Sequence, residues 1–319
     1  MKTTARFRDP LRQRLLFLTV LWLLTLALGA WLSPHFWQSS TVPYLLQYVP
    51  VLGLLGMGQT LIMLAGGPGI DLSVGAMVSL VGLAIAGLYG LGLDIYLASL
   101  VGLLVGALLG AVNGVLINIV GIPSLMATLA TLFVYSGLAV ALTGGRPLGG
   151  IPGEFAWLGQ NQTWNLPNQF LFVFLPVTLV LHVLLTRTVT GNHIVAAGND
   201  ERAAFLVGVN VRRLRLKLYV LSGVLAALGA IITVSWFQAA RPDAGKGLEL
   251  LSVTAAVLGG THIFGGLGRI SGTLLAILII TTLQIGLQLA NISQAWQLGV
   301  IGALLIGSVA VDSLLGRRP

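Results

Sequence analysis

The sequence predicts an all-α, polytopic membrane protein with about ten transmembrane helices. Hydrophobic residues make up 56% of the 319 residues and charged residues only 8%, whereas soluble domains carry roughly 25% charged residues. Many apolar stretches run for about 17 to 25 residues, which is the length needed to cross a hydrocarbon core. These stretches are spread evenly along the chain, so we expect a single transmembrane domain over residues 1–319.

The predicted spans follow the hydropathy of the chain. The ten ranges are 15–33, 44–65, 73–90, 95–118, 122–142, 169–186, 215–237, 249–262, 271–290 and 295–315. The first span follows the basic segment MKTTARFRDPLRQR and ends in WLSPHFW, without a small-x-small cleavage site. We therefore favour an uncleaved span over a secretory signal peptide.

Basic residues predict the orientation of the chain. Of the 17 Lys and Arg residues, only Arg146, Arg241 and Lys246 fall on one side of the ten spans, and the other 14 fall on the opposite side. The positive-inside rule places the richer side in the cytoplasm. Both termini and the loop 187–217 are then cytoplasmic, and the loop 143–168 lies outside. This outer loop is rich in Gly, Pro and Asn, which is typical of either a lid on the outer face or a plain connector.

Several classes of function lack their usual signature. The chain has no Cys, and its four His are scattered, so no metal site is expected. Complete GxxxxGK[ST], GxGxxG, HExxH and GxSxG motifs are absent, so we expect no catalytic residues and no ATP bound by this chain. No paired carboxylates lie within a span, as an ion-coupled carrier would need. The basic residues are not interleaved with aromatic ones, which argues against nucleic acid as a partner.

A break between the second and third predicted spans reads GGPGIDLSVGAMVSL, residues 66–80. Glycines and Pro68 end a helix and allow non-helical backbone. We predict that Asp71 caps the next helix; a hinge or gate, or contact with a transported solute, are the alternatives. GGLGRISGT at 265–273 is similarly rich in glycine. The helix-break or gate candidates are Gly66, Gly67, Pro68, Gly69, Asp71, Ser73, Gly259, Gly260, Gly265, Gly266 and Gly268.

Glycines recur four residues apart in GLLVGALLGAVNG, residues 102–114. Small residues at this spacing allow two helix backbones to approach closely in lipid. We therefore predict a tight helix–helix contact along Gly102, Gly106 and Gly110.

The cytoplasmic loop contains a short predicted helix, from about Asp200 to Val207. Asn199 or Asp200 can cap it, and acidic residues in its first turn suit the helix dipole. Its small, mostly apolar face is formed by Ala203, Ala204, Phe205 and Val207. Such a helix docks into the groove of a partner or lies on the membrane surface.

Three stretches in order resemble a family of transport proteins. AAGNDERAAFLVGVNVRRLRL (196–216) is similar to the pattern A-x-G-x-N-x-x-A-A-x-x-x-G-[IV]-x-V of permease subunits in bacterial ABC importers for monosaccharides. The GGPGIDLSVG stretch resembles their Gly-Gly-Ile-Asp-Leu-Ser-Val-Gly motif, with two additional residues here. LELLSVTAAVLGGTHIFGGLGRISGTLLA (248–276) resembles their third motif, and AWQLGVIGALLIGSVAVD (295–312) continues the match. The family includes ribose, xylose, arabinose, galactofuranose and autoinducer-2 permeases.

This resemblance implies a permease domain, in a bacterial inner membrane, that serves sugar import dependent on a binding protein. The chain would not be an enzyme, because a separate ABC subunit binds ATP and magnesium and hydrolyses the ATP. A periplasmic sugar-binding protein, a second permease copy or sister permease, and membrane lipid would be its other partners. By position, the element that couples to the ATPase would comprise Gly198, Asn199, Asp200, Glu201, Arg202, Ala203, Ala204 and Gly208.

The sequence leaves open which solute is transported and which polar residues line its pathway. The same architecture could import branched-chain amino acids or nucleosides, and a secondary carrier, a channel or an intramembrane enzyme is a more distant alternative. Polar residues at span depth face a cavity or another helix rather than lipid, and interhelical hydrogen bonds are the alternative to a role in transport. The substrate-pathway candidates are Gln59, Asn113, Asn118, Thr131, Tyr135, Trp236 and Gln284.

Overall fold

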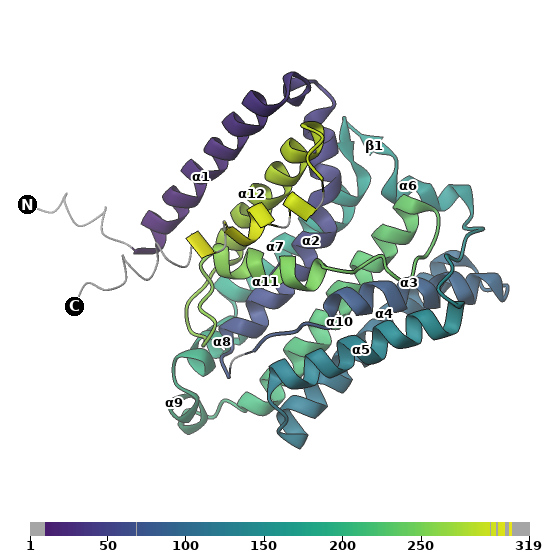
Figure 1. Cartoon of the computed structure of the whole chain (residues 1–319). Coiled ribbons are helices and arrows are strands. Elements are labelled where there is room, and N and C mark those ends of the chain that lie inside the picture. The colour runs from purple at the N-terminus through teal and green to yellow at the C-terminus, as the bar shows by residue number, and fades with distance from the viewer. Residues whose placement is uncertain (1–9, 68, 294, 298, 304–305, 308–319) are drawn as a thin grey trace, which may run out of the picture.

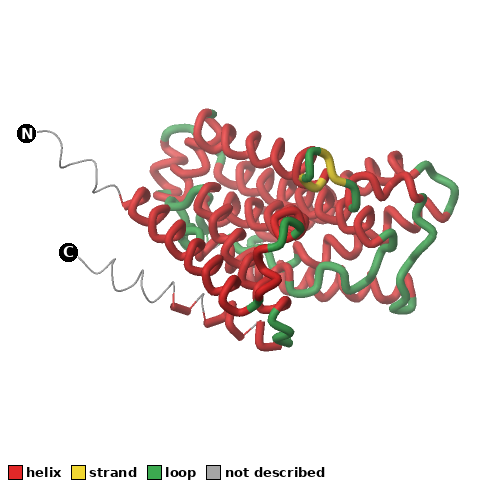
Figure 2. Tube along the Cα trace, turned by 90° about the horizontal axis from the view of Figure 1, so that it is seen from above, coloured by secondary structure: helices red, strands yellow, loops and turns green. Residues whose placement is uncertain are grey.

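The computed structural model describes residues 10–67, 69–293, 295–297, 299–303 and 306–307, and most of these residues are helical (Figure 1). The longer helices are α1 (Pro10–Leu32), α2 (Thr41–Leu64), α3 (Val74–Gly90), α4 (Ile95–Val115), α5 (Ser124–Thr143), α7 (Leu175–Arg187), α8 (Val189–Asn199), α10 (Val211–Phe237), α11 (Leu248–Leu258) and α12 (Ile270–Leu289). The shorter elements are η2 (Pro34–Trp37), η3 (Leu116–Val120), η4 (Gly153–Phe155), α6 (Ala156–Gly159), η5 (Phe170–Phe174) and α9 (Glu201–Leu206). Strands β1 (Gln162–Thr163) and β2 (Leu166–Pro167) form one small antiparallel hairpin (Figure 2). The all-α prediction is confirmed.

Membrane-spanning helices account for most of the described chain. Among the described residues, seven helical segments are long and apolar enough to cross a membrane: Gln13–Leu32, Thr41–Leu64, Ile95–Val120, Ser124–Thr143, Phe170–Arg187, Val211–Phe237 and Ile270–Leu289. The chain is thus a polytopic membrane protein. The predicted last span, 295–315, lies only partly within the described residues.

The helices form a buried centre and an apolar periphery. Of the most apolar stretch of α2, 83% is buried, compared with 17% for α1. α10 packs against α2, α3 and α4, while α12 packs against α1, α2 and α11 (Figure 1). On α4, Leu97, Leu100, Leu104 and Leu108 are exposed and fall three or four residues apart, on one helix face. The periphery can therefore face lipid.

Two helices inside the bundle are short. α3 has 17 residues, and α11 has 11, so α11 rises only about 16 Å, roughly half of a hydrocarbon core. The predicted range 249–262 overestimates this helix, because Gly259 and Gly260 end it after Leu258, while a glycine-rich segment before Gly247 precedes its start. The start of α3 meets this segment, since Gly75 and Gly245 touch backbone to backbone with no room for a Cβ on either residue.

The contact between α4 and α10 confirms the prediction from glycine spacing. A Cβ on Gly106 would clash with the carbonyl oxygen of Gly223, and a Cβ on Gly110 would clash with that of Tyr219. Gly102 instead packs against the side chain of Ile85. The small residues therefore let these two backbones approach closely.

The two long loops are more ordered than predicted. The cytoplasmic loop 187–217 folds into α8 and α9 before α10 begins, and α8 was not predicted. The loop 143–168 contains η4, α6 and the hairpin. Leu148 in this loop pairs with Ala240 through two backbone hydrogen bonds of 2.8 and 2.9 Å. We call the end of the bundle that holds this pair the outer end, after the predicted orientation, and the end that holds α8 and α9 the inner end.

Candidate functional site

Three glycine-rich segments, far apart in the sequence, meet at the inner end of the bundle. They are the α2–α3 break (65–73), the α8–α9 turn (198–200) and the α11–α12 loop (259–269). A Cβ added to Gly66 would lie 3.0 Å from the Cα of Gly198, and one added to Gly265 would lie 2.6 Å from the Cα of Gly66. We call these three touching residues, Gly66, Gly198 and Gly265, the glycine junction.

Hydrogen bonding and backbone conformation fix the glycine junction. The N–H of Gly266 donates to the carbonyl oxygen of Leu64 at 3.1 Å. Gly66 and Gly265 have φ angles of +73° and +103°, which glycine adopts without steric cost. The side-chain oxygen of Asn199 occupies the space that a Cβ on Gly266 would need. The end of α2, the α8–α9 turn and the α11–α12 loop are therefore in direct contact.

Other break candidates also lie at close approaches. Gly259 leaves no room for a Cβ beside the start of α12, where the amide nitrogen of Thr273 would be 2.5 Å away. Gly260 is covered by the side chain of Arg14 on α1. Gly67 and Gly69 in the break and Gly268 in the loop also approach neighbouring atoms too closely for a Cβ. Pro68 lies outside the described residues.

A buried polar cluster surrounds Asp71, whose side chain is 0% exposed. Asp71 Oδ1 accepts hydrogen bonds from the backbone N–H of Ser73 at 3.0 Å and from its hydroxyl at 2.7 Å. Asp71 Oδ2 accepts one from Ser222 on α10 at 3.2 Å. Asn113 on α4 donates to Ser73 Oγ at 2.7 Å, and Thr131 on α5 donates to Asn113 Oδ1 at 2.8 Å. The Asp71 cluster, as we call these five residues, ties the break to three helices.

The prediction that Asp71 caps α3 is wrong. The N-cap position is occupied by Ser73, and α3 begins at Val74. Asp71 lies two residues before the cap and accepts the N–H of Ser73, as in an Asx-turn. Within the described residues its side chain makes no ion pair, and its hydrogen-bond partners include one backbone amide and two hydroxyl groups.

The seven predicted pathway residues do not lie together. Asn113 and Thr131 belong to the Asp71 cluster, and Gln59 Oε1 accepts the N–H of Asp71 at 3.2 Å. Tyr135 donates to the carbonyl oxygen of Leu109 at 3.1 Å. The others lie elsewhere: Asn118 in η3, Trp236 near the outer end of α10, and Gln284 on α12. In this structure, three of the seven take part in interhelical hydrogen bonds and Gln59 bonds to the break, and a role of any of the seven in transport stays a prediction.

The start of α9 matches the sequence prediction closely. Asp200 Oδ1 accepts the backbone N–H groups of Arg202 at 2.8 Å and of Ala203 at 3.0 Å. Asp200 is therefore the N-cap, and of the two candidate caps it is the one used. Ala204 is buried and holds the helix against the protein, and Gly208, at φ +89°, follows its end.

Beyond this cap, α9 presents apolar side chains outward. Phe205, Leu206 and Val207 are 72%, 84% and 78% exposed. A cavity of about 540 Å³ lies beside them; it is lined by Glu201, Arg202, Phe205, Leu206, Asn210, Val211 and Arg212. Exposed apolar clusters rimmed by polar residues mark sites of contact with proteins or membranes. The predicted apolar face had included the buried Ala204 and lacked Leu206, because the sequence does not show which side of so short a helix faces the protein.

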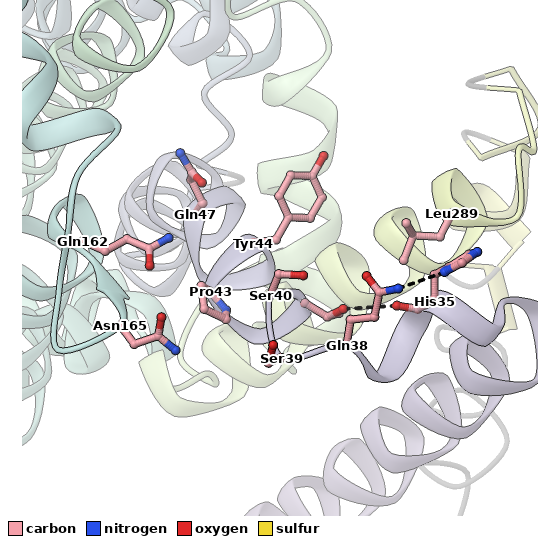
Figure 3. A pocket seen from close by; sticks show the side chains of 11 residues that line it. His35, Gln38, Ser39, Ser40, Pro43, Tyr44, Gln47, Gln162, Asn165 and Leu289 are labelled. Carbon is pink, nitrogen blue, oxygen red and sulfur yellow. Dashed lines mark hydrogen bonds between the residues drawn. The ribbon is translucent and has the colours of Figure 1, made fainter.

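An unpredicted cavity of about 510 Å³ opens at the outer end (Figure 3). Its lining comes from the η2–α2 connection, the first turns of α2, the hairpin region and the end of α12: His35, Gln38, Ser39, Ser40, Thr41, Pro43, Tyr44, Gln47, Gln162, Asn165 and Leu289. Among the described residues that line it, none is Asp, Glu, Lys or Arg. Tyr44 continues into an aromatic series with Tyr48 and Trp236, whose neighbouring ring centroids lie 5.0 and 4.8 Å apart.

The loop 143–168 packs over the outer end of α10. Gly159 donates its N–H to Ser235 Oγ at 2.8 Å, and the side chain of Gln160 donates to the carbonyl oxygen of Trp236 at 2.8 Å. On the adjacent loop, the Arg241 guanidinium hydrogen-bonds to Asp243 and holds the pKa of that carboxyl below its usual range. These contacts fit a fixed cover and a plain connector equally well.

Sequence reasoning missed two polar residues on α10. Ser222 reaches the Asp71 cluster, and Arg215 contacts both Glu201 and Ala65. In the sequence, Arg215 was used only as one of the positive charges that predict the orientation of the chain. Ser222 belongs to none of the motifs. Asp71 lies 151 residues from Ser222 and Ala65 lies 150 residues from Arg215 in the sequence, so no local signal could have identified these two contacts.

Comparison with known proteins gives this arrangement a family. Residues 42–309 match the family described as "Branched-chain amino acid transport system / permease component". The chain belongs to this permease family. The permease is 39% identical to the ribose import permease protein of Bacillus subtilis (strain 168), over 88% of this chain and 87% of that protein.

Further relatives of the permease point the same way. The D-allose transport system permease protein of Escherichia coli (strain K12) is 33% identical, over 90% of this chain and 87% of that protein. The autoinducer 2 import system permease protein of Enterobacter sp. (strain 638) is 35% identical, over 84% and 83% respectively. No solved structure matches the chain. The resemblance of the motifs to ABC importer permeases is thus confirmed.

Membership of this family has three consequences. The permease is a transport component and not an enzyme. It is a multi-pass protein of the inner membrane, as its apolar helices require. Permease components of ABC importers act with an ATPase and a binding protein, so partners of these two general kinds are implied.

Proposed function

We propose that this permease forms the transmembrane pathway of an ATP-driven importer for a monosaccharide or similar small sugar, together with a second copy of itself or a sister permease. The observation that carries this proposal is the 39% identity to a ribose import permease over most of both chains. The D-allose relative adds a second sugar. The amide, hydroxyl and aromatic groups around the outer cavity suit a solute with many hydroxyl groups, since they supply neutral donors, acceptors and ring faces.

The outer cavity also bears on the amino-acid alternative that the family description names. A free amino acid carries both an ammonium and a carboxylate group, and taking either out of water without a charged partner is costly. The described lining residues offer no acidic or strongly basic side chain to either group. An uncharged sugar meets no such cost, so the cavity favours sugar over amino acid.

The substrate test uses proteoliposomes that contain the permease with its own ATPase subunit, with binding protein outside and ATP and magnesium inside. Uptake of radiolabelled D-ribose is measured alone and with an excess of unlabelled D-allose, L-leucine or adenosine. We expect unlabelled D-allose to reduce the uptake of D-ribose, and L-leucine and adenosine to leave it unchanged. Competition by L-leucine or adenosine alone would overturn the assignment to sugars.

We further propose that α9 is the docking element for the partner ATPase, which holds the ATP and magnesium. The element extends from Gly198 to Gly208, with Phe205, Leu206 and Val207 as apolar anchors. Their high exposure supports this role, because a short helix docks by inserting such side chains into a groove. A periplasmic sugar-binding protein would then meet the opposite, outer end.

The docking proposal is tested by co-purification of the ATPase with Leu206→Asp. Leu91→Asp is the matched control, since Leu91 is 86% exposed and lies in the turn after α3 at the outer end. We expect the Leu206 variant to insert in normal amounts and lose the ATPase, whereas the Leu91 variant keeps it. Normal co-purification with Leu206→Asp would contradict docking at α9 and would favour contact of this helix with lipid.

A further inference from the structure

Arg215 on α10 joins α9 to the break between α2 and α3. Its Nη1 lies 2.9 Å from Oε2 of Glu201, in the first turn of α9. Its Nε donates to the carbonyl oxygen of Ala65, which follows α2, at 3.1 Å. The planar guanidinium fork makes both contacts at once. A lysine ammonium is a single charge on a flexible stem and lacks this fork.

The surroundings of Arg215 hold its guanidinium in place. The Arg215 side chain is 16% exposed, whereas that of Glu201 is 55% exposed. Gly67 leaves the space that the guanidinium needs, because a Cβ there would lie 2.8 Å from Arg215 Cζ. The break is therefore shaped around this side chain, which distinguishes Arg215 from the exposed Arg213 on the same helix.

The break connects Arg215 to the helices of the bundle. Gly66 contacts Gly198 at the glycine junction, so α9 reaches the break through both the backbone and the Arg215 side chain. At the far end of the break, Asp71 is held by Ser222, about two turns along α10 from Arg215. A displacement of the break must therefore disturb the hydrogen bonds of the Asp71 cluster or carry its helices with it.

We propose that Arg215 is a positioning residue that transmits displacement of α9 to the α2–α3 break during transport. Glu201 precedes the exposed residue Phe205 by four positions, about one helical turn, so both move with the same short helix. Force applied by a partner at Phe205–Val207 passes through the Glu201 carboxylate to the Arg215 guanidinium and on to the carbonyl group of Ala65. This inference rests on the proposed function, because docking of the ATPase is what would displace α9.

The test compares Arg215→Lys, Glu201→Gln and the double variant in the reconstituted importer. D-ribose uptake and ATP hydrolysis are measured in the same proteoliposomes, and co-purification of the ATPase is measured separately. We expect each single variant to retain the ATPase while uptake per ATP hydrolysed falls at least about fivefold, the lower end of typical coupling effects. The double variant should fall no further than Arg215→Lys, because both changes break one connection.

Arg213→Lys is the matched control, with the same substitution two residues away on an exposed side chain, and it should leave uptake per ATP unchanged. Wild-type ratios in both single variants would overturn the inference. If Arg215→Lys does not accumulate in the membrane, Glu201→Gln decides. Glu201 is exposed, and Arg215 keeps its hydrogen bond to Ala65 when the Glu201 carboxylate is removed. Failure of the wild type to couple uptake to ATP would instead refute the proposed function, so the two failures are distinguishable.

Discussion

The side-chain amide of Asn113 on α4 donates a hydrogen bond of 2.7 Å to the hydroxyl oxygen of Ser73, just before α3. Both side chains are completely buried. Through this bond a break in the chain is fixed to a membrane-spanning helix by polar groups, in surroundings where unpaired polar groups are costly. The Asp71 cluster is therefore expected to behave as one unit.

Replacing Asn113 by Leu should destabilise the permease. The change leaves Ser73 Oγ without its donor and removes one of the two acceptors of the Thr131 hydroxyl, and an unsatisfied buried group costs about 1–3 kcal/mol. Thermal unfolding in detergent would show the loss as a lower transition temperature. Thr143→Val is the control, since among the described residues its hydroxyl bonds only to the carbonyl oxygen of Ala139 on the same helix. Equal stability of the Asn113 variant and the control would contradict the cluster.

Asp71→Asn and Asp71→Leu separate a structural role of Asp71 from a role of its charge. Asparagine keeps one oxygen to accept from Ser73, and the Ser222 hydroxyl can rotate to accept from the new amide. Leucine can accept from neither partner. We expect Asp71→Asn to retain most uptake and Asp71→Leu to lose both stability and uptake. If Asp71→Asn abolished uptake at a normal unfolding temperature, the charge itself would be required for transport.

Gly198→Ala should disrupt the glycine junction. A Cβ at this position would clash with the carbonyl oxygen of Leu64 and the amide nitrogen of Gly266, and overpacking of this kind typically costs about 1–3 kcal/mol. We expect a lower unfolding temperature and reduced uptake. Gly137→Ala on α5 is the matched control, because nothing lies within 4 Å of its added Cβ. An unfolding temperature for Gly198→Ala equal to that of the control would show that the three segments are not in close contact.

Gly110→Val tests the contact between α4 and α10. The added side chain would clash with the backbone of Tyr219 and force the helices apart, at a cost of about 1–3 kcal/mol. Gly87→Val on α3 is the control, since its Cβ would meet nothing within 4 Å. Thermal unfolding in detergent should give a lower transition temperature for Gly110→Val than for Gly87→Val. A Gly110 variant as stable as the Gly87 variant would argue against close backbone approach.

Local signals predicted those parts of the fold that depend on local chemistry. Hydropathy predicted ten spans, and in the described part of the chain seven of them match helices long enough to cross a membrane. Glycine spacing predicted the α4–α10 contact, and the acidic start of α9 predicted its cap at Asp200. The end of α11 was predicted too late, at residue 262, because hydropathy does not register that Gly259 and Gly260 end the helix after Leu258.

The candidate site was predicted only in parts. The three glycine-rich segments were recognised separately, but contact between Gly66, Gly198 and Gly265 depends on how distant helices pack. For the same reason, Asp71 was taken for a helix cap. Its burial among donors from α4 and α10, and the bridging position of Arg215, are tertiary features that leave no periodic pattern in the sequence.

The most direct test of the account is D-ribose uptake by proteoliposomes that hold the permease with or without its ATPase subunit. We expect uptake only when the ATPase, ATP with magnesium inside and the binding protein outside are all present. We expect none by the permease alone, with or without a proton gradient. Uptake by the lone permease, driven by a proton gradient in the absence of ATP, would contradict it.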